Sequence, residues 1–569
     1  MSKTVIIGGV AAGSSCAARL RRLKEDEEIV LVERGEYISF ANCGLPYYIG
    51  GAIAERENLL LMTAERMNKR HRIDVRLRSE VTAINREEKT VTIHDRAAFK
   101  MYDERYDHLL IATGSAPVMP PLPGIGSDRV ESLWTVPDAD RIKKRCLEES
   151  VHRAVIVGGG FIGLELAENL REAGLDVLIV EMSDQVLPSL DREMALLLEA
   201  ELRKNGVGLK LGRGVTAFEE RGGALAVSLN DGTAVETDLA VVAVGIRPNG
   251  QLAKEAGLAV NERGGIVVDA HLRTSDPAIY AAGDVIEVEE PILGGRTMIP
   301  LAGPANKQGR VAAGNIAGGD EVCRGSRGTS VAKVFGLTAA SVGLTEKALA
   351  QKGLAKGKDY ETVTIVQNSH AGYYPGAVPL TLKLLFAADG EKIFGAQIVG
   401  ADGADKRIDT IAASMYYGGT VADLAGLELA YAPPYSSAKD PVNMAGFCAG
   451  NLLDGMVKFA AWDSVETEPD SVILDVREKA EVEAFGLGRA VHIPMGQLRE
   501  RLNELDPRKR TIVFCAIGVR GYNAARLLAQ KGFADVAVYP GGFRFYRGTH
   551  PDSGDVGENG GIPPCFRLK

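Results

Sequence analysis

The stretch "RAVIVGGGFIGLELAENLREAGLDVLIVEM", residues 153–182, decides the fold of this chain. It predicts a strand, a glycine turn, a helix and a second strand, with Gly158, Gly160 and Gly163 in the register G-x-G-x-x-G. Such glycines permit a tight turn and let backbone amides at a helix N-terminus approach a pyrophosphate. Glu181 ends the second strand, where a carboxylate accepts from a free ribose 2′-hydroxyl and repels a 2′-phosphate. The stretch therefore predicts a Rossmann-like unit that binds NADH in preference to NADPH.

A less complete copy of this pattern stands near the N-terminus. There "KTVIIGGVAAGSSCAARLRRL" precedes "EIVLVER", again a strand, a glycine turn, a helix and a strand. Gly8 and Gly13 fit the fingerprint, whereas Val10 occupies the position of the middle glycine. Glu33, at the end of the second strand, can accept from a ribose hydroxyl. The chain therefore carries two dinucleotide-binding patterns.

Two further segments indicate which dinucleotides these are. "LLIATGSAP" (109–117) resembles the crossover strand of flavoproteins that bind two dinucleotides. "IYAAGDV" (279–285) resembles the segment whose aspartate, here Asp284, contacts the ribityl and phosphate region of FAD. The resemblance implies FAD in the N-terminal unit and NADH in the second. The expected cofactor-binding residues are Gly8, Gly13, Glu33, Arg34, Ala112, Thr113, Gly114, Gly158, Gly160, Gly163, Glu181, Gly245, Gly283, Asp284, Pro304 and Ala305.

Composition is that of an ordinary globular protein. The 569 residues are 46% hydrophobic and 25% charged, and the net charge of −9 argues against a nucleic-acid partner. No stretch approaches the roughly 20 apolar residues that span a bilayer, and the N-terminal apolar run is too short for a signal peptide. The seven cysteines form no C-x-x-C pair, which argues against a zinc site or a disulfide framework. We expect a cytoplasmic protein with reduced cysteines, no metal site and no membrane partner.

One cysteine stands alone in a turn-rich segment, "SFANCGLPYYIGG" (39–51). The thiolate of Cys43 would attack a sulfur or oxygen electrophile and then interact with a flavin. Simple buried packing is the alternative, because free cysteine is often buried. The neighbouring Gly44 and Pro46 favour a shaped functional turn.

Residues 1–445 resemble the single-cysteine pyridine nucleotide-disulfide oxidoreductases, among them the coenzyme A-disulfide reductases and the NADH-dependent persulfide reductases. "SFANCGLPYYIGG", "HAGYYPGA" (370–377) and "YAPPYSSAKDPVN" (431–443) carry this resemblance with the nucleotide motifs. It implies that Cys43 forms a mixed disulfide with coenzyme A, whose thiol replaces a second cysteine. The related NADH peroxidases and oxidases place a histidine in the first glycine loop, where this chain has Ala11, so peroxide or oxygen chemistry ranks second.

The same resemblance implies further site residues. Tyr373 and Tyr431 match paired tyrosines that reach the flavin site from the other subunit, where a phenol can protonate a departing thiolate; a homodimer with a shared active site is therefore expected. His71 stands where a lysine is frequent and Asn306 where a histidine is found. The expected coenzyme A-binding residues are Ser15, Arg19, Arg22, Ser39, Asn42, His71, Asn306 and Lys439.

The C-terminal hundred or so residues alternate strands and helices around "CAIGVRG", as expected of one small α/β domain. Cys515 follows a strand and Arg520 opens a helix, so loop amides and the helix N-terminus would stabilise a thiolate or a persulfide. The alternative is a strand-ending buried cysteine. "LDVRE", "HIP" and "YPGG" add to a resemblance to rhodanese domains. The loop length implies sulfur as cargo, since related phosphatases use a loop one residue longer.

The predicted fold class is α/β, with two Rossmann-like domains, an α+β dimerisation domain and a rhodanese domain. The predicted bounds are 1–112 with 240–322 for FAD, 113–239 for NAD(H), 323–445 for dimerisation, 446–465 for a linker and 466–569 for the rhodanese domain.

The predicted function is FAD-dependent, NADH-driven reduction of persulfide sulfur, with Cys43, Cys515, Tyr373, Tyr431 and Arg520 as catalytic residues. The substrates would be small sulfur compounds, including coenzyme A persulfide or polysulfide. Coenzyme A-disulfide reduction is the alternative that uses the same residues. A redox sensor that binds FAD without useful turnover is a third hypothesis.

Overall fold

The computed structural model describes residues 2–550, which divide into two compact units. The first unit contains residues 2–184 and 207–328, and the second contains residues 185–206 and 329–550.

The first unit begins with a five-stranded parallel sheet, which confirms the N-terminal dinucleotide fold. In spatial order its strands are β19 (Ile279–Ala281), β7 (His108–Ile111), β1 (Lys3–Ile7), β2 (Glu28–Val32) and β3 (Asp74–Arg76). The central strands are buried, which explains their nearly continuous runs of β-branched residues and leucine.

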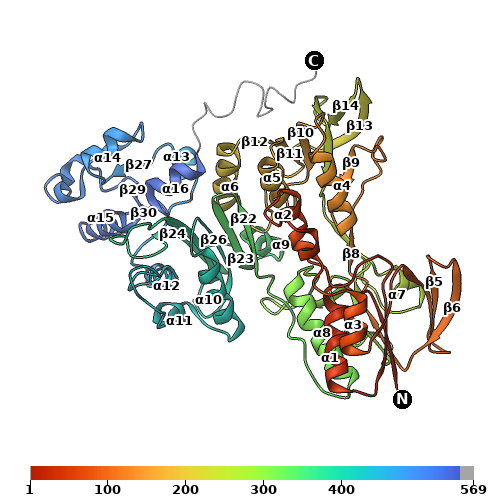
Figure 1. The fold of residues 1–569 in the computed structure, drawn as a ribbon. Helices are drawn as coiled ribbons and strands as arrows, with labels where there is room; N and C mark the ends of the chain where they lie inside the picture. The colour runs from red at the N-terminus through yellow and green to blue at the C-terminus, as the bar shows by residue number, and fades with distance from the viewer. Residues whose placement is uncertain (1, 551–569) are drawn as a thin grey trace. The chain divides into compact units, whose positions relative to one another are not determined.

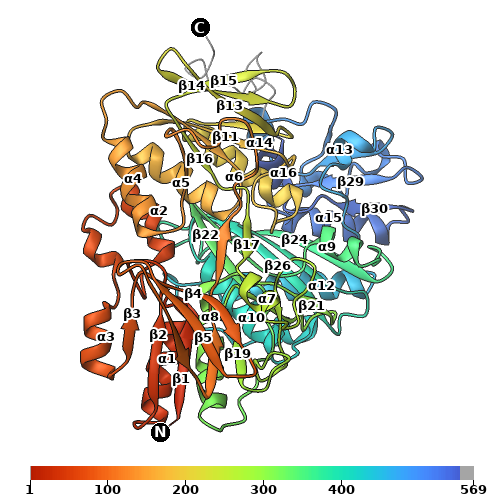
Figure 2. The ribbon, with the colours of Figure 1, turned by 90° about the vertical axis from the view of Figure 1, so that its right-hand side faces the viewer.

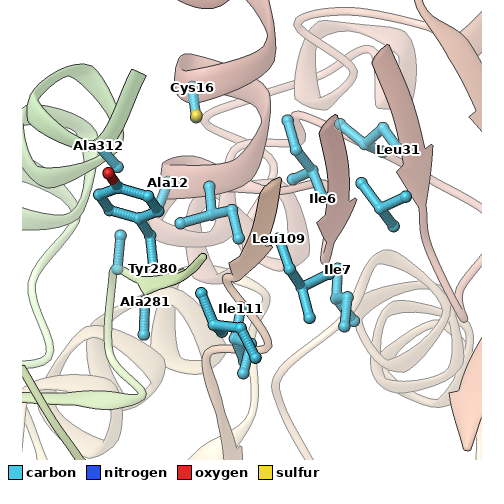
Figure 3. Packing of buried hydrophobic residues seen from close by; sticks show 14 of the residues in the cluster. Ile6, Ile7, Ala12, Cys16, Leu31, Leu109, Ile111, Tyr280, Ala281 and Ala312 are labelled. Atoms are coloured by element: carbon cyan, nitrogen blue, oxygen red, sulfur yellow. The ribbon is translucent and has the colours of Figure 1, made fainter. Parts of the chain in front are cut away.

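Two helices lie side by side on this core, α1 (Ala11–Leu23) and α8 (Ala302–Ile316) (Figure 1). They approach closely at Gly309, where a Cβ atom would lie 2.3 Å from the carbonyl oxygen of Ala12. Figure 3 shows Ala12 and Ala312 next to the ring of Tyr280, with Cys16 one turn further along α1. Buried side chains of both helices thereby fix where the N-terminus of α1 lies.

A second parallel sheet confirms the other dinucleotide pattern. In spatial order its strands are β12 (Val207–Leu211), β11 (Asp176–Glu181), β10 (Arg153–Val157), β16 (Leu239–Val242) and β9 (Val130–Ser132). Helix α5 (Phe161–Glu172) follows β10 directly, as the quoted stretch predicts. A small antiparallel sheet accompanies this one (Figure 2): β13 (Val215–Arg221), β14 (Ala224–Leu229) and β15 (Ala234–Thr237).

Shorter elements complete the first unit. Its helices are η1 (Asn42–Gly44), α2 (Leu45–Ile49), η2 (Arg56–Leu59), α3 (Ala64–His71), α4 (Val136–Cys146) and α7 (Gln251–Glu255). Its remaining strands are β4 (Ser79–Asn85), β5 (Thr90–Asp95), β6 (Lys100–Arg105), β8 (Ser115–Pro117), β17 (Ile246–Pro248), β18 (Ile266–Val267), β20 (Ile286–Glu289) and β21 (Arg296–Thr297).

The second unit contains a five-stranded antiparallel sheet, in which residues 379–400 form a hairpin. Its strands in order are β22 (Ser330–Val334), β23 (Leu337–Gly343), β26 (Ile393–Gly400), β25 (Pro379–Ala387) and β24 (Tyr360–Asn368). The helices around it are α6 (Arg192–Lys204), α9 (Glu346–Gln351), α10 (Ala404–Tyr416), α11 (Val421–Gly426) and α12 (Pro441–Leu453).

A buried lysine fastens two of these helices to the sheet. Lys383 on β25 is 1% exposed, and its Nζ lies 2.8 Å from Asp191, 2.5 Å from Glu193 and 2.5 Å from Glu346. Burial alone would lower the pKa of Lys383, but the three carboxylates raise it, so the ammonium stays charged. This cluster joins the N-terminal ends of α6 and α9 to β25.

The C-terminal part of this unit has a four-stranded parallel sheet with helices between its strands, which confirms the predicted small α/β domain. In order its strands are β28 (Val491–His492), β27 (Val472–Asp475), β29 (Thr511–Phe514) and β30 (Val536–Val538). Its helices are α13 (Ser464–Thr467), α14 (Lys479–Ala484), η3 (Met495–Gln497), η4 (Leu502–Glu504), α15 (Val519–Gln530) and α16 (Gly542–Thr549). Helix α16 packs against α6 and β24 (Figure 2). None of the helices between residues 2 and 550 combines the length and apolar character that a bilayer crossing requires.

Candidate active site

Both glycine turns bring the backbone closer than a side chain would allow. Gly8 has a φ of +99° and Gly158 a φ of +115°. A Cβ atom would lie 2.2 Å from the Ala112 carbonyl oxygen at Gly8, and 2.4 Å from the Ala243 carbonyl oxygen at Gly158. At Gly13 and Gly163 a Cβ would lie 1.8 Å and 2.1 Å from the carbonyl oxygen of the first glycine of the same turn. Both helices therefore begin tightly against their strands. Each of the two turns therefore forms a cradle that fits a dinucleotide pyrophosphate.

The two predicted acidic residues occupy equivalent places. Glu33 accepts from the Gly9 amide at 2.8 Å, and Glu181 accepts from the Gly159 amide at 2.6 Å. The second oxygen of each carboxylate accepts from a backbone amide two residues further on, at 2.7 Å in both cases. Each carboxylate is thus fixed beside its glycine turn, where it fits a ribose hydroxyl. Met182, which follows Glu181, is 78% exposed and brings no positive charge for a 2′-phosphate.

The remaining predicted cofactor positions follow strands of the two sheets or lie on α8. Because the carboxyl ends of parallel strands share one edge of a sheet, residues directly after β1, β2, β7 and β19 gather at one edge. There Asp284 accepts from Ser115 at 3.1 Å, and burial raises the pKa of this aspartate. The other positions are Arg34, exposed; Ala112, Thr113 and Gly114, after β7; Gly160, at the start of α5; Gly245, after β16; Gly283, after β19; Pro304 and Ala305, on α8.

Cys43 lies in η1, directly before α2, and is exposed. Its pKa is nevertheless raised, by partial desolvation and then by the negative charges of Glu165 and Asp284. Glu165 lies on α5, where burial raises its pKa to about 7, and Tyr47 Oη lies 3.5 Å from it. The carboxylates of the chain therefore oppose formation of the Cys43 thiolate. Sequence reasoning assigned no role to Glu165, although it stands two residues after the last glycine of its fingerprint.

The segment that carries Cys43 is fastened to the first glycine turn. The Ser39 amide donates to the Gly9 carbonyl at 2.8 Å, and Ser39 has a φ of +46°, which is uncommon for a residue with a side chain. Asn42 opens η1 next to the cysteine. The predicted substrate residues Ser39 and Asn42 thus belong to the cysteine segment itself.

Most other predicted coenzyme A residues gather around α1. Ser15 donates to Asn306 on α8 at 2.5 Å. Desolvation and the positive charge of Arg22 lower the pKa of His71 at the end of α3. The Nε of Arg19 is buried and has no hydrogen-bond partner, and such an unpaired cationic donor fits an anionic group such as a phosphate.

The two predicted tyrosines meet in the second unit. Tyr373 lies in the segment after β24 and Tyr431 in the segment before α12, and their hydroxyl oxygens are 2.7 Å apart. Tyr373 is 76% exposed and Tyr431 48% exposed. Their mutual hydrogen bond raises the pKa of Tyr373. Lys439, also in the segment before α12, is exposed.

A buried arginine that sequence reasoning missed joins these two segments. Arg407 on α10 donates to the Ser369 carbonyl at 2.8 Å and to Asp440 Oδ2 at 3.0 Å. Ser436 donates to the same carboxylate oxygen at 2.6 Å, and its carbonyl accepts from the Ala371 amide at 3.0 Å. These hydrogen bonds hold the segment of Tyr373 at Ser369 and Ala371. They hold the segment of Tyr431 at Ser436 and Asp440.

The second predicted nucleophile, Cys515, directly follows β29 and is buried. The Gly518 amide donates to its Sγ at 3.0 Å, and α15 begins one residue later, so part of the predicted amide cradle is present. Arg520 in the first turn of α15 donates to Glu481 on α14 at 2.6 Å and 2.7 Å. Sequence reasoning placed Arg520 at the sulfur site but did not identify its carboxylate partner.

Three family models match the chain in succession. Residues 2–309 match pyridine nucleotide-disulphide oxidoreductases, residues 329–441 match the dimerisation domain of that group, and residues 461–548 match the rhodanese-like domain. The predicted fold class is therefore confirmed, whereas the exact domain bounds stay predictions.

Similar proteins extend this result. Coenzyme A disulfide reductase of Staphylococcus epidermidis is 34% identical over 450 residues, which are 79% of this chain and 100% of that protein. The crystal structure of reduced Bacillus anthracis CoADR-RHD has 48% sequence identity and a TM-score of 0.92, covering 97% of this chain and 99% of that chain. An NAD-dependent persulfide reductase from A. fulgidus has 40% identity and a TM-score of 0.91, covering 95% of this chain and 99% of that chain.

Replacing Arg407 with methionine should destabilise the protein by about 3–5 kcal/mol, because the substitution leaves the buried Asp440 carboxylate without its cation. Urea unfolding measures the loss. Lys406→Met is the matched control, since Lys406 is the exposed neighbour on the same helix. Equal free energies of unfolding for the two variants would contradict the role given to Arg407.

Proposed function

The chain belongs to the pyridine nucleotide-disulphide oxidoreductase family, and on that premise we propose that it is an NADH-dependent persulfide reductase with a fused carrier of sulfane sulfur. One observation carries this proposal. The segment of a lone cysteine is hydrogen-bonded to the first glycine turn, and a second cysteine in the same chain accepts a hydrogen bond from a loop amide before a helix. The relatives from Bacillus anthracis and A. fulgidus match this arrangement over nearly its whole length.

FAD and NADH are the cofactors that the two cradles suit. The first glycine turn, Glu33 and Asp284 would hold FAD, and the second turn with Glu181 would hold NADH rather than NADPH. Bound in this way, FAD would supply two-electron transfer between NADH and the disulfide that involves Cys43. The chain's own residues orient both dinucleotides at the carboxyl ends of their strands.

The first chemical step is an attack by Cys43. Its thiolate attacks the carbon-bound sulfur of coenzyme A persulfide, so that one S–S bond forms, one S–S bond breaks, and hydrosulfide leaves. The resulting mixed disulfide takes up two electrons and two protons, which returns the Cys43 thiol and releases coenzyme A. Coenzyme A would be bound by Ser15, Arg19, Arg22, Ser39, Asn42, His71, Asn306 and Lys439.

Proton transfer is the task we assign to the exposed tyrosine pair. Tyr373 and Tyr431 share a hydrogen bond, so one phenol can donate a proton to a departing thiolate while the other keeps it oriented. We assign the pair to the active site of a partner subunit in a homodimer. The match of residues 329–441 to a dimerisation domain supports this arrangement.

The C-terminal domain supplies the sulfur in this proposal. Cys515 accepts a sulfane sulfur as a persulfide and passes it to coenzyme A, which carries it to Cys43. Fusion of the two domains raises the effective concentration of the sulfur donor.

Coenzyme A-disulfide reduction is the second candidate. The staphylococcal relative of that name matches the chain over 79% of its length. The same residues would perform it, since Cys43 can attack a coenzyme A disulfide and release coenzyme A in place of hydrosulfide. This reaction leaves the C-terminal cysteine loop without a task, which is why we place it second.

Replacing Cys43 with serine should lower NADH-dependent persulfide reduction by at least about 10³-fold, because a hydroxyl neither ionises at neutral pH nor forms a disulfide. Steady-state NADH oxidation measures the rate, and flavin absorbance checks that FAD is retained. Cys146→Ser, at the C-terminal end of α4, should keep wild-type activity. Full turnover by the Cys43 variant would refute the assigned nucleophile.

Replacing Cys515 with serine should abolish transfer of sulfur from polysulfide to coenzyme A but spare reduction of coenzyme A persulfide supplied directly. The two reactions should respond differently because only sulfur transfer from polysulfide needs a persulfide on Cys515. Chromatographic detection of coenzyme A persulfide and NADH oxidation measure the two reactions. Loss of both in a variant that still holds FAD would show that the cysteines act only together, against this proposal.

A further inference from the structure

The loop that carries Cys515 has a single charged residue of its own. Its sequence "CAIGVR" contains the apolar Ala516, Ile517 and Val519 and ends at Arg520. An arginine at this place would attract an anionic sulfur donor toward the cysteine, because a cation raises the local concentration of anions. Arg520 precedes Gly521, where a Cβ atom would lie 3.7 Å from Cys515 Sγ, so the first turn of α15 lies against the sulfur.

The charge of this arginine is neutralised within the domain. Both terminal nitrogens of Arg520 donate to Glu481, one to each carboxylate oxygen, at 2.6 Å and 2.7 Å. The Glu478 amide donates to the same carboxylate at 2.9 Å and holds it in place. The hydrogen bonds from Arg520 lower the pKa of Glu481 to about 2, so the pair persists at neutral pH. A bidentate pair of this kind is geometrically fixed.

Two further arginines near the loop contact an acidic or aromatic partner in the same domain. Arg477 is buried against Asp475 and lies over the ring of Phe543. Arg547 lies over the ring of Phe485. Glu478 is exposed and adds a second negative charge beside Arg520.

Two exposed arginines remain on α16, Arg544 and Arg547, of which Arg544 is hydrogen-bonded to the loop. The backbone amide of Arg544 donates to the Ala516 carbonyl at 3.0 Å, and the arginine itself is exposed. Arg544 is therefore a second cation that could attract an anionic donor, and its replacement by glutamine distinguishes its effect from that of Arg520.

We propose that Glu481 is a specificity-determining residue, which cancels the charge of Arg520 so that Cys515 takes sulfur from organic persulfides in preference to the thiosulfate dianion. The inference deepens the proposed function and rests on Cys515 as the sulfur acceptor. An organic persulfide has at most one negative charge at its reacting end, whereas thiosulfate has two. A loop without net positive charge therefore disfavours thiosulfate more strongly.

Both donors react by the same displacement. With an organic persulfide, the Cys515 thiolate attacks the terminal sulfur, the S–S bond of the donor breaks, and the electron pair leaves on the organic thiolate. With thiosulfate, the thiolate attacks the outer sulfur and the electron pair leaves on sulfite. In each case one S–S bond forms and one breaks, no external oxidant or reductant is needed, and Cys515 becomes a persulfide.

The test uses the full-length chain with Cys43→Ser, which blocks reduction of the product. Intact-protein mass spectrometry follows the gain of one sulfur atom at Cys515 after addition of thiosulfate or glutathione persulfide. In Glu481→Gln the rate constant for thiosulfate should rise at least about fivefold, because an uncompensated charge then faces a dianion. The rate constant for glutathione persulfide should change by less than about twofold, and high salt should remove the gain for thiosulfate.

Two variants serve as controls. Glu483→Gln removes a carboxylate on the same helix whose partner is Lys479, and it should leave both rate constants unchanged. Glu481→Asp keeps the negative charge and should stay close to the parent chain. A retained rate with glutathione persulfide shows that each variant is folded.

Three results would overturn the inference. The first is an unchanged thiosulfate rate in Glu481→Gln beside a normal persulfide rate. The second is an equal gain in Glu483→Gln. The third is a gain that disappears when Arg544→Gln is added, because the exposed arginine would then be the cation that matters. If no donor places sulfur on Cys515 in the parent chain, the carrier role itself fails, and the inference fails with it.

Discussion

The reductase half of this protein depends on the absence of a side chain at two glycine turns. At Gly8 and Gly158 a Cβ would lie within 2.4 Å of a carbonyl oxygen, so only glycine lets each helix start where its strand ends. Backbone amides of these same turns donate to the carboxylates of Glu33 and Glu181. The segment that contains Cys43 is hydrogen-bonded to the first turn through the Ser39 amide. The same backbone constraint thus positions one carboxylate beside each turn and, at the first turn, the segment of the cysteine that we propose as the nucleophile.

The two cysteines stand in different electrostatic surroundings. Partial desolvation and the carboxylates of Glu165 and Asp284 raise the pKa of Cys43, so the chain itself keeps this thiol protonated. Cys515, by contrast, receives the Gly518 amide at the start of α15. In the proposed function the Gly518 amide would therefore contact the sulfur that Cys515 carries, whereas Cys43 has to lose its proton before it attacks.

The sequence permitted correct prediction wherever the signal is local. Glycine spacing, a terminal acid and alternating strands and helices identified both nucleotide folds and the C-terminal domain, because each pattern lies within one short segment. What it did not reveal depends on partners far apart along the chain. The contact of Arg407 with Asp440, the cluster around Lys383 and the pair of Arg520 with Glu481 are set by packing. Neither hydrophobic periodicity nor a sequence motif predicts which carboxylate an arginine will pair with.

The central claim is that persulfide sulfur is the substrate of this reductase. Anaerobic NADH oxidation by the purified protein, with kcat/KM compared for coenzyme A persulfide and coenzyme A disulfide, tests it most directly, with peroxide as a control. The account predicts a kcat/KM at least about tenfold higher for the persulfide, because hydrosulfide leaves and the C-terminal domain supplies that substrate. A higher kcat/KM for the disulfide would contradict it.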